Sequence, residues 1–353
     1  MKKTSKDFLK KIMAVSCPSG FEQPVQRLIS AEMKKLADKV RTDVHGNVIA
    51  VKNEGAPLRL MLAGHCDEIG FMITHVDGEG FISVATIGGV DPAIVPGMRV
   101  KIHGRRGPVT GVIGRKPIHL MQAEDRGKGV KLEHLWIDIG AKNRKDAEKS
   151  VAVGDVATFD VGYDELKNNI VVARGFDDRI GSFIVVETMR LLARKKPKVA
   201  VYGVSTVQEE VGLRGARTSA YGIDPHVGIA IDVGFAADYP GANKKRVGDI
   251  KLGGGPILHL GPNINPAVAK LLDAAARKAK VKTQMQAEPR ATGTDANAIQ
   301  LTRAGVAAGL ISVPNRYMHT PVEAVHLGDV ENCAKLLAAF IMQLTPTTSF
   351  IPK

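Results

Sequence analysis

The sequence has few cysteines and few aromatic residues, and each shortage excludes a class of protein. Its three cysteines, Cys17, Cys66 and Cys333, lie far apart and form no CxxC pair, which argues against a disulfide framework and against a cysteine zinc or redox motif. Scattered, unpaired thiols are typical of reduced cytoplasmic proteins. Aromatic residues make up 5% of the chain, too few for a stacking platform that binds nucleic-acid bases or sugar rings.

Long apolar runs are also missing. A transmembrane helix needs roughly 18 or more apolar residues, and no stretch approaches that length. Near the N-terminus only Ile12–Val15 is continuously apolar, whereas a signal peptide has an apolar region of about 7–15 residues. We therefore expect no membrane partner and a cytoplasmic location.

The net charge of +13 raises the question of a nucleic-acid partner. The lysines and arginines are spread along the chain, however, and their densest groups are short runs such as Arg105–Arg106 and Lys244–Arg246. This distribution indicates a solvated basic surface. We expect no nucleic-acid partner.

The pattern along the 353 residues predicts an α/β fold with an insertion. Residues 1–70 and 162–353 alternate apolar strands with helical segments, which favours an α/β domain whose mixed sheet has helices on both faces. Residues 71–161 are rich in glycine, proline and short alternating runs, which predicts a small all-β barrel inserted into that domain. Helices are expected at residues 6–15, 23–37, 179–195, 213–221, 266–279, 295–303 and 330–344. Strands are expected at 58–63, 199–207, 227–232, 283–286 and 307–313.

Carboxylates and histidines follow these predicted strands or open a helix. They are His65 with Asp67, Asp177, the adjacent Glu209 and Glu210, Asp232, and His319. Each alone would pass for an ordinary residue such as a turn aspartate or a helix cap. Because strand ends meet at one edge of an open α/β sheet, where active sites lie, we expect these side chains to converge.

The residue types predict a metal site. Oxygen and nitrogen ligands without thiolate suit zinc, cobalt or manganese. A carboxylate such as Asp177 can bridge two ions through its two oxygens. The neighbouring Glu209 and Glu210 repel each other, so we expect one to bind metal and the other to act as a general base. The sequence therefore predicts two divalent metal ions per chain, zinc or cobalt, with manganese as a third candidate.

The motifs, taken in order, resemble the tetrahedral aminopeptidase family, which includes glutamyl, leucyl and deblocking aminopeptidases. The likeness covers nearly the whole chain. The segments that carry it are GHCDEIG at 64–70, DDR at 177–179, QEEVGLRG at 208–215, Asp232, GTDA at 293–296 and YMHTP at 317–321. It implies an α/β metallopeptidase fold of the phosphorylase/hydrolase-like type with an inserted β domain. It also implies peptide substrates cut at the N-terminal bond and a homo-oligomer, commonly a tetrahedral dodecamer built from dimers.

The resemblance also implies which residues hold the metal ions. His65 and Asp232 would hold one ion, and Glu210 and His319 would hold the other. Asp177 would bridge the two.

Further roles follow from the same resemblance. Glu209 would be the general base, and Asp67 would orient the histidine of the first metal site. Gly293 and Thr294 belong to a loop that resembles the family's substrate loop. Arg290, close by in sequence, is a substrate-binding candidate that could attract an acidic first side chain.

Three other functions compete with an aminopeptidase. An endo-glucanase-type glycoside hydrolase could use Glu209 with a second carboxylate and would need no metal. A related metallo-carboxypeptidase or deacylase would share most ligands and act on N-blocked substrates. A non-enzymatic binding or scaffold protein leaves the ligand motifs unexplained. His259, in a glycine-rich stretch, receives no role from the sequence.

Overall fold

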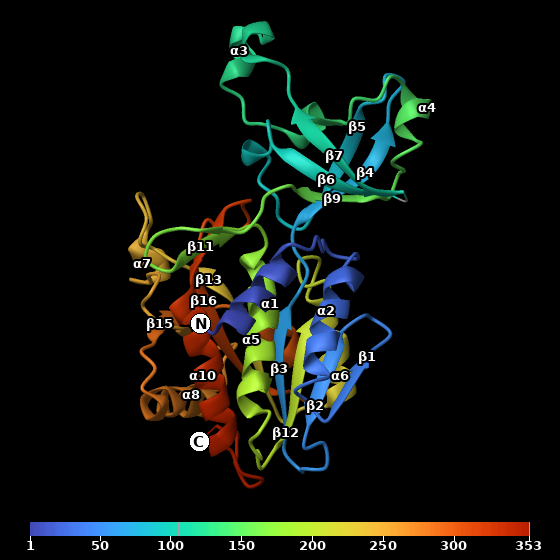
Figure 1. Cartoon of the computed structure of the whole chain (residues 1–353). Helices are drawn as coiled ribbons and strands as arrows, with labels where there is room; N and C mark the ends of the chain where they lie inside the picture. Colours follow the sequence, from blue (N-terminus) through green and yellow to red (C-terminus); the bar gives the residue numbers. More distant parts are fainter. Residues whose placement is uncertain (105, 353) are drawn as a thin grey trace.

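The computed structural model describes residues 1–104 and 106–352, and it has two parts (Figure 1). The larger part is an 11-stranded mixed sheet covered by helices, and the smaller is a closed six-stranded barrel that stands above it. Among the described helices, none combines the length and the apolar content that crossing a bilayer would require. The structure thus confirms the predicted fold class, including the all-β unit.

The large sheet has the strand order β1-β2-β12-β3-β13-β16-β17-β11-β10, and β14 with β15 branches from β16. The central strands β12, β3, β13 and β16 are parallel, and the strands toward both edges pair antiparallel. The bounds are β1 Lys39–Thr42, β2 Val48–Lys52, β3 Arg59–His65, β10 Asp164–Glu165, β11 Ile170–Ala173, β12 Ala200–Thr206, β13 Val227–Phe235, β14 Ile257–Leu260, β15 Gln284–Ala287, β16 Ala307–Arg316 and β17 Glu323–His326.

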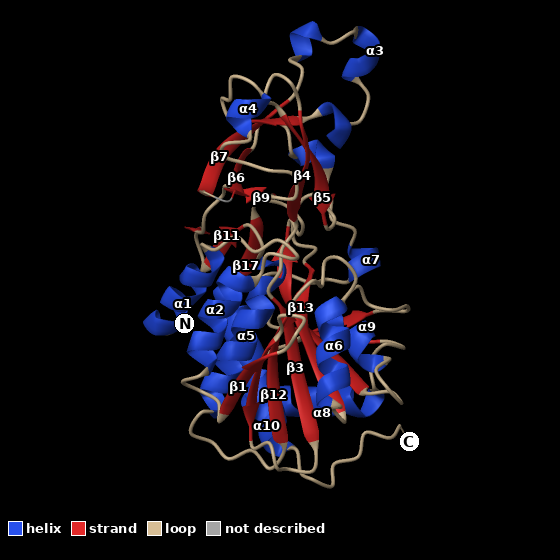
Figure 2. Ribbon diagram, turned by 90° about the vertical axis from the view of Figure 1, so that its right-hand side faces the viewer, coloured by secondary structure: helices blue, strands red, loops and turns tan. Residues whose placement is uncertain are grey.

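Helices cover both faces of this sheet (Figure 2). Strand β3 explains why: Leu60 and Leu62 belong to one apolar core, while Met61 and Ala63 belong to another. Successive side chains of a strand point to opposite faces, so a continuous apolar strand must be buried on both. One face packs against α1 Lys3–Met13, α2 Gln23–Met33, α5 Phe176–Leu192, α8 Pro266–Ala279 and α10 Leu327–Gln343; the other packs against α6 Arg214–Ile223 and α9 Asp295–Gln300.

The barrel closes in the order β4-β5-β8-β7-β6-β9, and its paired strands are antiparallel. Alternating side chains such as Phe71 and Ile73 fill its interior. The barrel strands begin at Gly70 and end at Phe159. These are bounds of strands, so the limits 71–161 of the inserted domain stay a prediction. Its elements are β4 Gly70–Val76, β5 Ile82–Ile87, β6 Arg99–Gly104, β7 Gly107–Gly114, β8 Trp136–Asp138 and β9 Val156–Phe159, with short helices α3 Ala123–Arg126 and α4 Arg144–Ala147; the short helix α7 Lys244–Val247 belongs to the large part.

Each predicted helix has a counterpart in the structure, with its ends shifted by a few residues. Local signals fix some ends well: α8 starts where the Asn265 side chain accepts the backbone N–H groups of Ala267 and Val268, with Pro266 at the first helical position. Sequence reasoning missed the short strands β11 and β17. They are four residues long and pair only with each other and with their neighbours at one side of the sheet, so no long apolar run marks them.

Candidate metal centre

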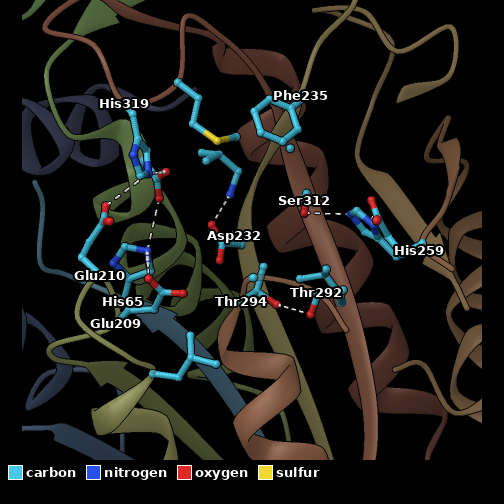
Figure 3. Close-up of a pocket in the computed structure, with 18 of the residues that line it drawn as sticks. His65, Glu209, Glu210, Asp232, Phe235, His259, Thr292, Thr294, Ser312 and His319 are labelled. Atoms are coloured by element: carbon cyan, nitrogen blue, oxygen red, sulfur yellow. Dashed lines mark hydrogen bonds and ion pairs between the residues drawn. The ribbon is translucent and has the colours of Figure 1, made fainter. Parts of the chain in front are cut away.

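The predicted ligand residues meet at the carboxyl ends of the central parallel strands (Figure 3). Two groups form there, and within each group the ligand atoms lie within 4.8 Å of one another. The first group is His65, Glu209 and Asp232, and the second is Asp177, Glu210 and His319.

Close packing of β3 against α5 sets the position of two of these residues. At Gly64, immediately before His65, a Cβ atom would collide with the backbone of Gly181 in α5. Gly175 has a left-handed φ of 65°, which lets the chain turn from β11 into α5 and brings Asp177 into the first turn. Glycines at these two places thus allow the two ligand segments to approach each other.

Asp177 belongs to the second group and also contacts the first. Its Oδ1 is 3.2 Å from Nε2 of His65, and its Oδ2 is 3.3 Å from Nε2 of His319. Each carboxylate oxygen therefore contacts the histidine of a different group, which is the arrangement that a bridging carboxylate requires.

The two adjacent glutamates divide between the groups in the same way. Glu209 Oε2 is 3.7 Å from Nε2 of His65, and Glu210 Oε1 is 3.6 Å from Nε2 of His319. Within the described part of the chain, Oε1 of each glutamate is buried and has no hydrogen-bond partner. Buried polar atoms are rarely left unsatisfied, and a cation would satisfy these. A donor set of imidazole nitrogen and carboxylate oxygen fits zinc, cobalt or manganese.

The side chains of the two groups have strongly shifted pKa values before any ion binds. Burial raises the pKa of Glu209 to about 10 and the pKa of Glu210 to about 8, and neighbouring carboxylates add to both shifts. Burial, together with the Asp177 carboxylate, also raises the pKa of Asp232 well above its usual range. The hydrogen bond with Asp177 raises the pKa of His319 to about 10. Protons thus occupy a centre that is rich in carboxylates, and divalent cations would displace them.

Asp67 supports both groups. Its Oδ1 accepts the backbone N–H of Glu209 at 3.1 Å, and its Oδ2 accepts the backbone N–H of Glu210 at 3.2 Å and the Ser19 hydroxyl at 2.7 Å. Nδ1 of His65 lies 3.1 Å from the backbone oxygen of Asp67 and 3.5 Å from Oδ1. The sequence predicted the contact with His65, whereas the hydrogen bonds from the backbone of Glu209 and Glu210 to Asp67 are seen only in the structure.

Two further carboxylates accept hydrogen bonds from the backbone N–H groups of ligand residues. The sequence gave a role to neither of them. Glu323 accepts the backbone N–H of Asp177 through Oε2 at 2.8 Å and that of His319 through Oε1 at 3.0 Å. Asp178 accepts the backbone N–H of His65 at 3.2 Å. Only their closeness in sequence to ligand residues could have indicated these roles: Glu323 comes four residues after His319, and Asp178 is next to Asp177.

The barrel contributes a contact to the second group. Nδ1 of His319 lies 2.9 Å from the backbone oxygen of Gly89, which follows β5. A Cβ atom at Gly89 would come within 3.0 Å of that ring nitrogen. A hydrogen bond from Nδ1 to this carbonyl would leave Nε2 free to bind a metal.

A cavity of about 420 Å³ opens beside the two groups. Two of the predicted substrate-binding residues, Gly293 and Thr294, line it, whereas Arg290 is exposed and lies outside the lining residues. The Thr294 hydroxyl is 2.9 Å from that of Thr292, which lines the same wall (Figure 3). The cavity is also lined by polar residues to which the sequence assigned no role: His259, Gln286, Glu288 and Ser312.

Comparisons with known proteins identify the family and several relatives of the chain. The family model described as M42 glutamyl aminopeptidase matches residues 46–336. The lysyl aminopeptidase of Pyrococcus furiosus is 38% identical over 343 residues, which cover 96% of this chain and 97% of that protein. A solved aminopeptidase from Desulfurococcus kamchatkensis is 41% identical and superposes with a TM-score of 0.90, over 97% of this chain and 96% of that one.

A third relative bears on assembly. The TET1 peptidase of Pyrococcus horikoshii, which can assemble into a tetrahedron or a large octahedral shell, is 32% identical with a TM-score of 0.87, over 96% of this chain and 100% of that one. Fold and sequence agree with these relatives over nearly the full length of the chain. The chain therefore belongs to the M42 glutamyl aminopeptidase family, as its resemblance to the tetrahedral aminopeptidases predicted.

Proposed function

We propose that this chain is a metal-dependent aminopeptidase that hydrolyses the N-terminal bond of peptides with two divalent ions, zinc or cobalt, with manganese as a third candidate. The observation that carries this proposal is the position of Asp177, whose two carboxylate oxygens contact histidines of two separate ligand groups. Membership of an aminopeptidase family supports the reaction type.

Each ion would have two ligands of its own and would share Asp177 with the other ion. His65 and Asp232 would hold the first ion and Glu210 and His319 the second, with Asp177 shared. When bound, such a pair of ions activates water and polarises a carbonyl. The chain's own contribution is to fix the backbone of four of these five residues, all but Asp232, through hydrogen bonds to buried carboxylates, so that the ligands need little reorganisation.

Glu209 would act as the general base. Its side chain is buried beside His65, and one oxygen, Oε1, has no hydrogen-bond partner among the described residues. This carboxylate would take a proton from the attacking water and return it to the leaving amine. Asp67 fixes the Glu209 backbone, so it would be a positioning residue for the base.

The proposed partners are peptides and further copies of the same chain. A homo-oligomer, a dodecamer built from dimers, is supported by the likeness to a peptidase that can assemble into a tetrahedron or a large octahedral shell. The proposed location remains the cytoplasm, because the three cysteines are free and buried. Light scattering of the purified protein would report the number of subunits directly.

A substrate panel tests the proposal against its rivals. The purified protein would be assayed on aminoacyl p-nitroanilides, on the same compounds with an N-acetyl group, and on a β-glucan, each with and without chelator. The expected result is release only from free N-termini, which is lost with chelator and restored by zinc, cobalt or manganese. Release of acetate, or of p-nitroaniline from an N-acetylated compound, would favour a deacylase or another hydrolase of N-blocked substrates. Chelator-resistant cleavage of glucan would favour a glycoside hydrolase, and either result would overturn the proposal.

A further inference from the structure

The cavity beside the metal centre has a second polar cluster on its far wall, which we call the β14–β15 cluster: His259, Gln286, Glu288 and Ser312. Figure 3 shows His259 and Ser312 on the side of Asp232 that faces away from His65. The strands explain this proximity. Ser312 on β16 is the register partner of Asp232 on β13, and His259 on β14 is the register partner of Gln286 on β15. The cluster is therefore next to the first ligand group.

Two hydrogen bonds connect the four side chains of the cluster in pairs. The Gln286 amide donates from Nε2 to Oε1 of Glu288 at 2.7 Å, and Nε2 of His259 lies 2.9 Å from the Ser312 hydroxyl. Oε1 of Gln286 and Nδ1 of His259 are buried and have no hydrogen-bond partner among the described residues. In the tautomer that donates Nε2–H to Ser312, Nδ1 is an acceptor. The cluster thus offers unpartnered acceptors beside a carboxylate, which suits a ligand that carries several donors.

The charges also favour a cationic ligand. Burial lowers the pKa of His259 to about 4, so its ring is neutral at neutral pH. The described residues that line the cavity include no lysine and no arginine. Four carboxylates belong to the two ligand groups, and two divalent ions would balance their charges. Glu288, which lies 4.0 Å from Nδ1 of His259, would remain as an unbalanced negative charge in the cavity.

We infer that the β14–β15 cluster binds a cationic first side chain, so that the enzyme prefers peptides that begin with lysine or arginine. Ammonium and guanidinium groups carry only donors, which match the acceptors of Glu288, Gln286 and His259. This inference rests on the proposed function and names its substrate class. It opposes the expectation that Arg290 selects an acidic first residue, because Arg290 lies outside the cavity lining and Glu288 lies within it.

The test compares lysyl with norleucyl p-nitroanilide, whose side chains have the same carbon skeleton and differ by the terminal ammonium. For the wild type, kcat/KM is expected to be about 10- to 100-fold higher on the lysyl substrate. Glu288→Gln keeps the shape and removes the charge, so it is expected to bring this ratio close to one. Glu54→Gln is the matched control, because Glu54 is an exposed acid on a surface turn, and it should leave the ratio as in the wild type.

Three results would overturn the inference: a wild-type ratio near one, a glutamyl substrate cleaved faster than the lysyl one, or an unchanged ratio in Glu288→Gln. Cleavage of any aminoacyl substrate would keep the proposed function intact in each case. If no substrate is cleaved, the proposed function fails, and calorimetric titration of the metal-loaded protein with free lysine and norleucine still decides the inference. Tighter binding of lysine that is lost in Glu288→Gln supports it, and equal binding contradicts it.

Discussion

The carboxylate of Glu323 is bonded to the backbone of Asp177, whose N–H donates to Oε2 at 2.8 Å. The other oxygen of Glu323 accepts the backbone N–H of His319 at 3.0 Å. One buried side chain thus joins the proposed bridging ligand to a ligand of the second group. Strand β17 carries Glu323 into this position, beside the end of β16.

Glu323→Gln should weaken metal binding without unfolding the protein. Both carboxylate oxygens accept N–H groups, so the amide of glutamine must face a donor, which costs about 1–3 kcal/mol. Loss of such a support typically lowers metal affinity or activity roughly 10- to 100-fold. Metal titration and kcat/KM at saturating metal would measure the two effects. Wild-type metal affinity in this variant would show that the contacts of Glu323 are dispensable.

Glu209→Gln and Glu210→Gln form a matched pair of neighbouring substitutions with different expected outcomes. The first should keep both metal ions and lower kcat by roughly 100- to 10,000-fold, because it removes a general base. The second should lower the affinity for one ion, and added metal should restore part of the activity. Metal content after dialysis, measured beside kcat, separates the two. Loss of metal from Glu209→Gln would make this residue a ligand, which the grouping of Glu209 with His65 and Asp232 also allows.

Metal binding should strengthen as pH rises. Before an ion binds, the pKa of Glu210 is raised to about 8, and those of Glu209 and His319 are each raised to about 10. These groups therefore hold protons at neutral pH. An ion must displace such protons, and raising the pH from about 6 to about 8 makes their removal easier. Calorimetry in buffers of different ionisation enthalpy would count the protons released. Affinity that is independent of pH would contradict these protonation states.

Glu22→Gln should stabilise the protein above neutral pH. Burial raises the pKa of Glu22 from 4.5 to about 7, while Oε1 accepts the backbone N–H groups of Gly20 and Gln208. The folded pKa exceeds the unfolded one, so the wild type loses stability as pH rises from 4.5 to about 7 and does not regain it at higher pH. Glutamine keeps the acceptor and cannot ionise.

The expected gain from Glu22→Gln at pH 8 is up to about 3 kcal/mol in the free energy of unfolding, with little difference from the wild type near pH 4.5. Thermal unfolding of both proteins at the two pH values would measure it. The same difference at both values would mean that the charge of Glu22 has no part in it.

Much of the fold and the convergence of the chemical residues could be predicted from the sequence, for a specific physical reason. His65 ends β3, Glu209 and His319 follow the ends of β12 and β16, and Asp232 lies in the second half of β13. These four strands are parallel neighbours in the sheet, and parallel strands present their carboxyl ends at one edge. The core strands are long apolar runs, and the glycine-rich segment after Gly70 has the short alternating pattern of a barrel.

The supporting residues could not be predicted, because their contacts depend on strand pairings with weak local signals. Glu323 reaches Asp177, 146 residues away in sequence, through the four-residue strand β17. His259 and Glu288 meet in the cavity because β14 pairs in parallel with β15 and branches from β16. Arg290 is only two residues from Glu288 yet lies outside the cavity lining. A loop has no repeating pattern of side-chain directions, so the sequence could not show which of the two faces the cavity.

The number of metal ions bound per chain shows whether two separate metal sites share Asp177. The ions bound per chain would be counted by mass spectrometry of metals for the wild type, His65→Ala and His319→Ala after equilibration with zinc. We expect two ions in the wild type and one in each variant, because each histidine belongs to a different group. A single ion in the wild type, or two ions in both variants, would contradict the presence of two sites.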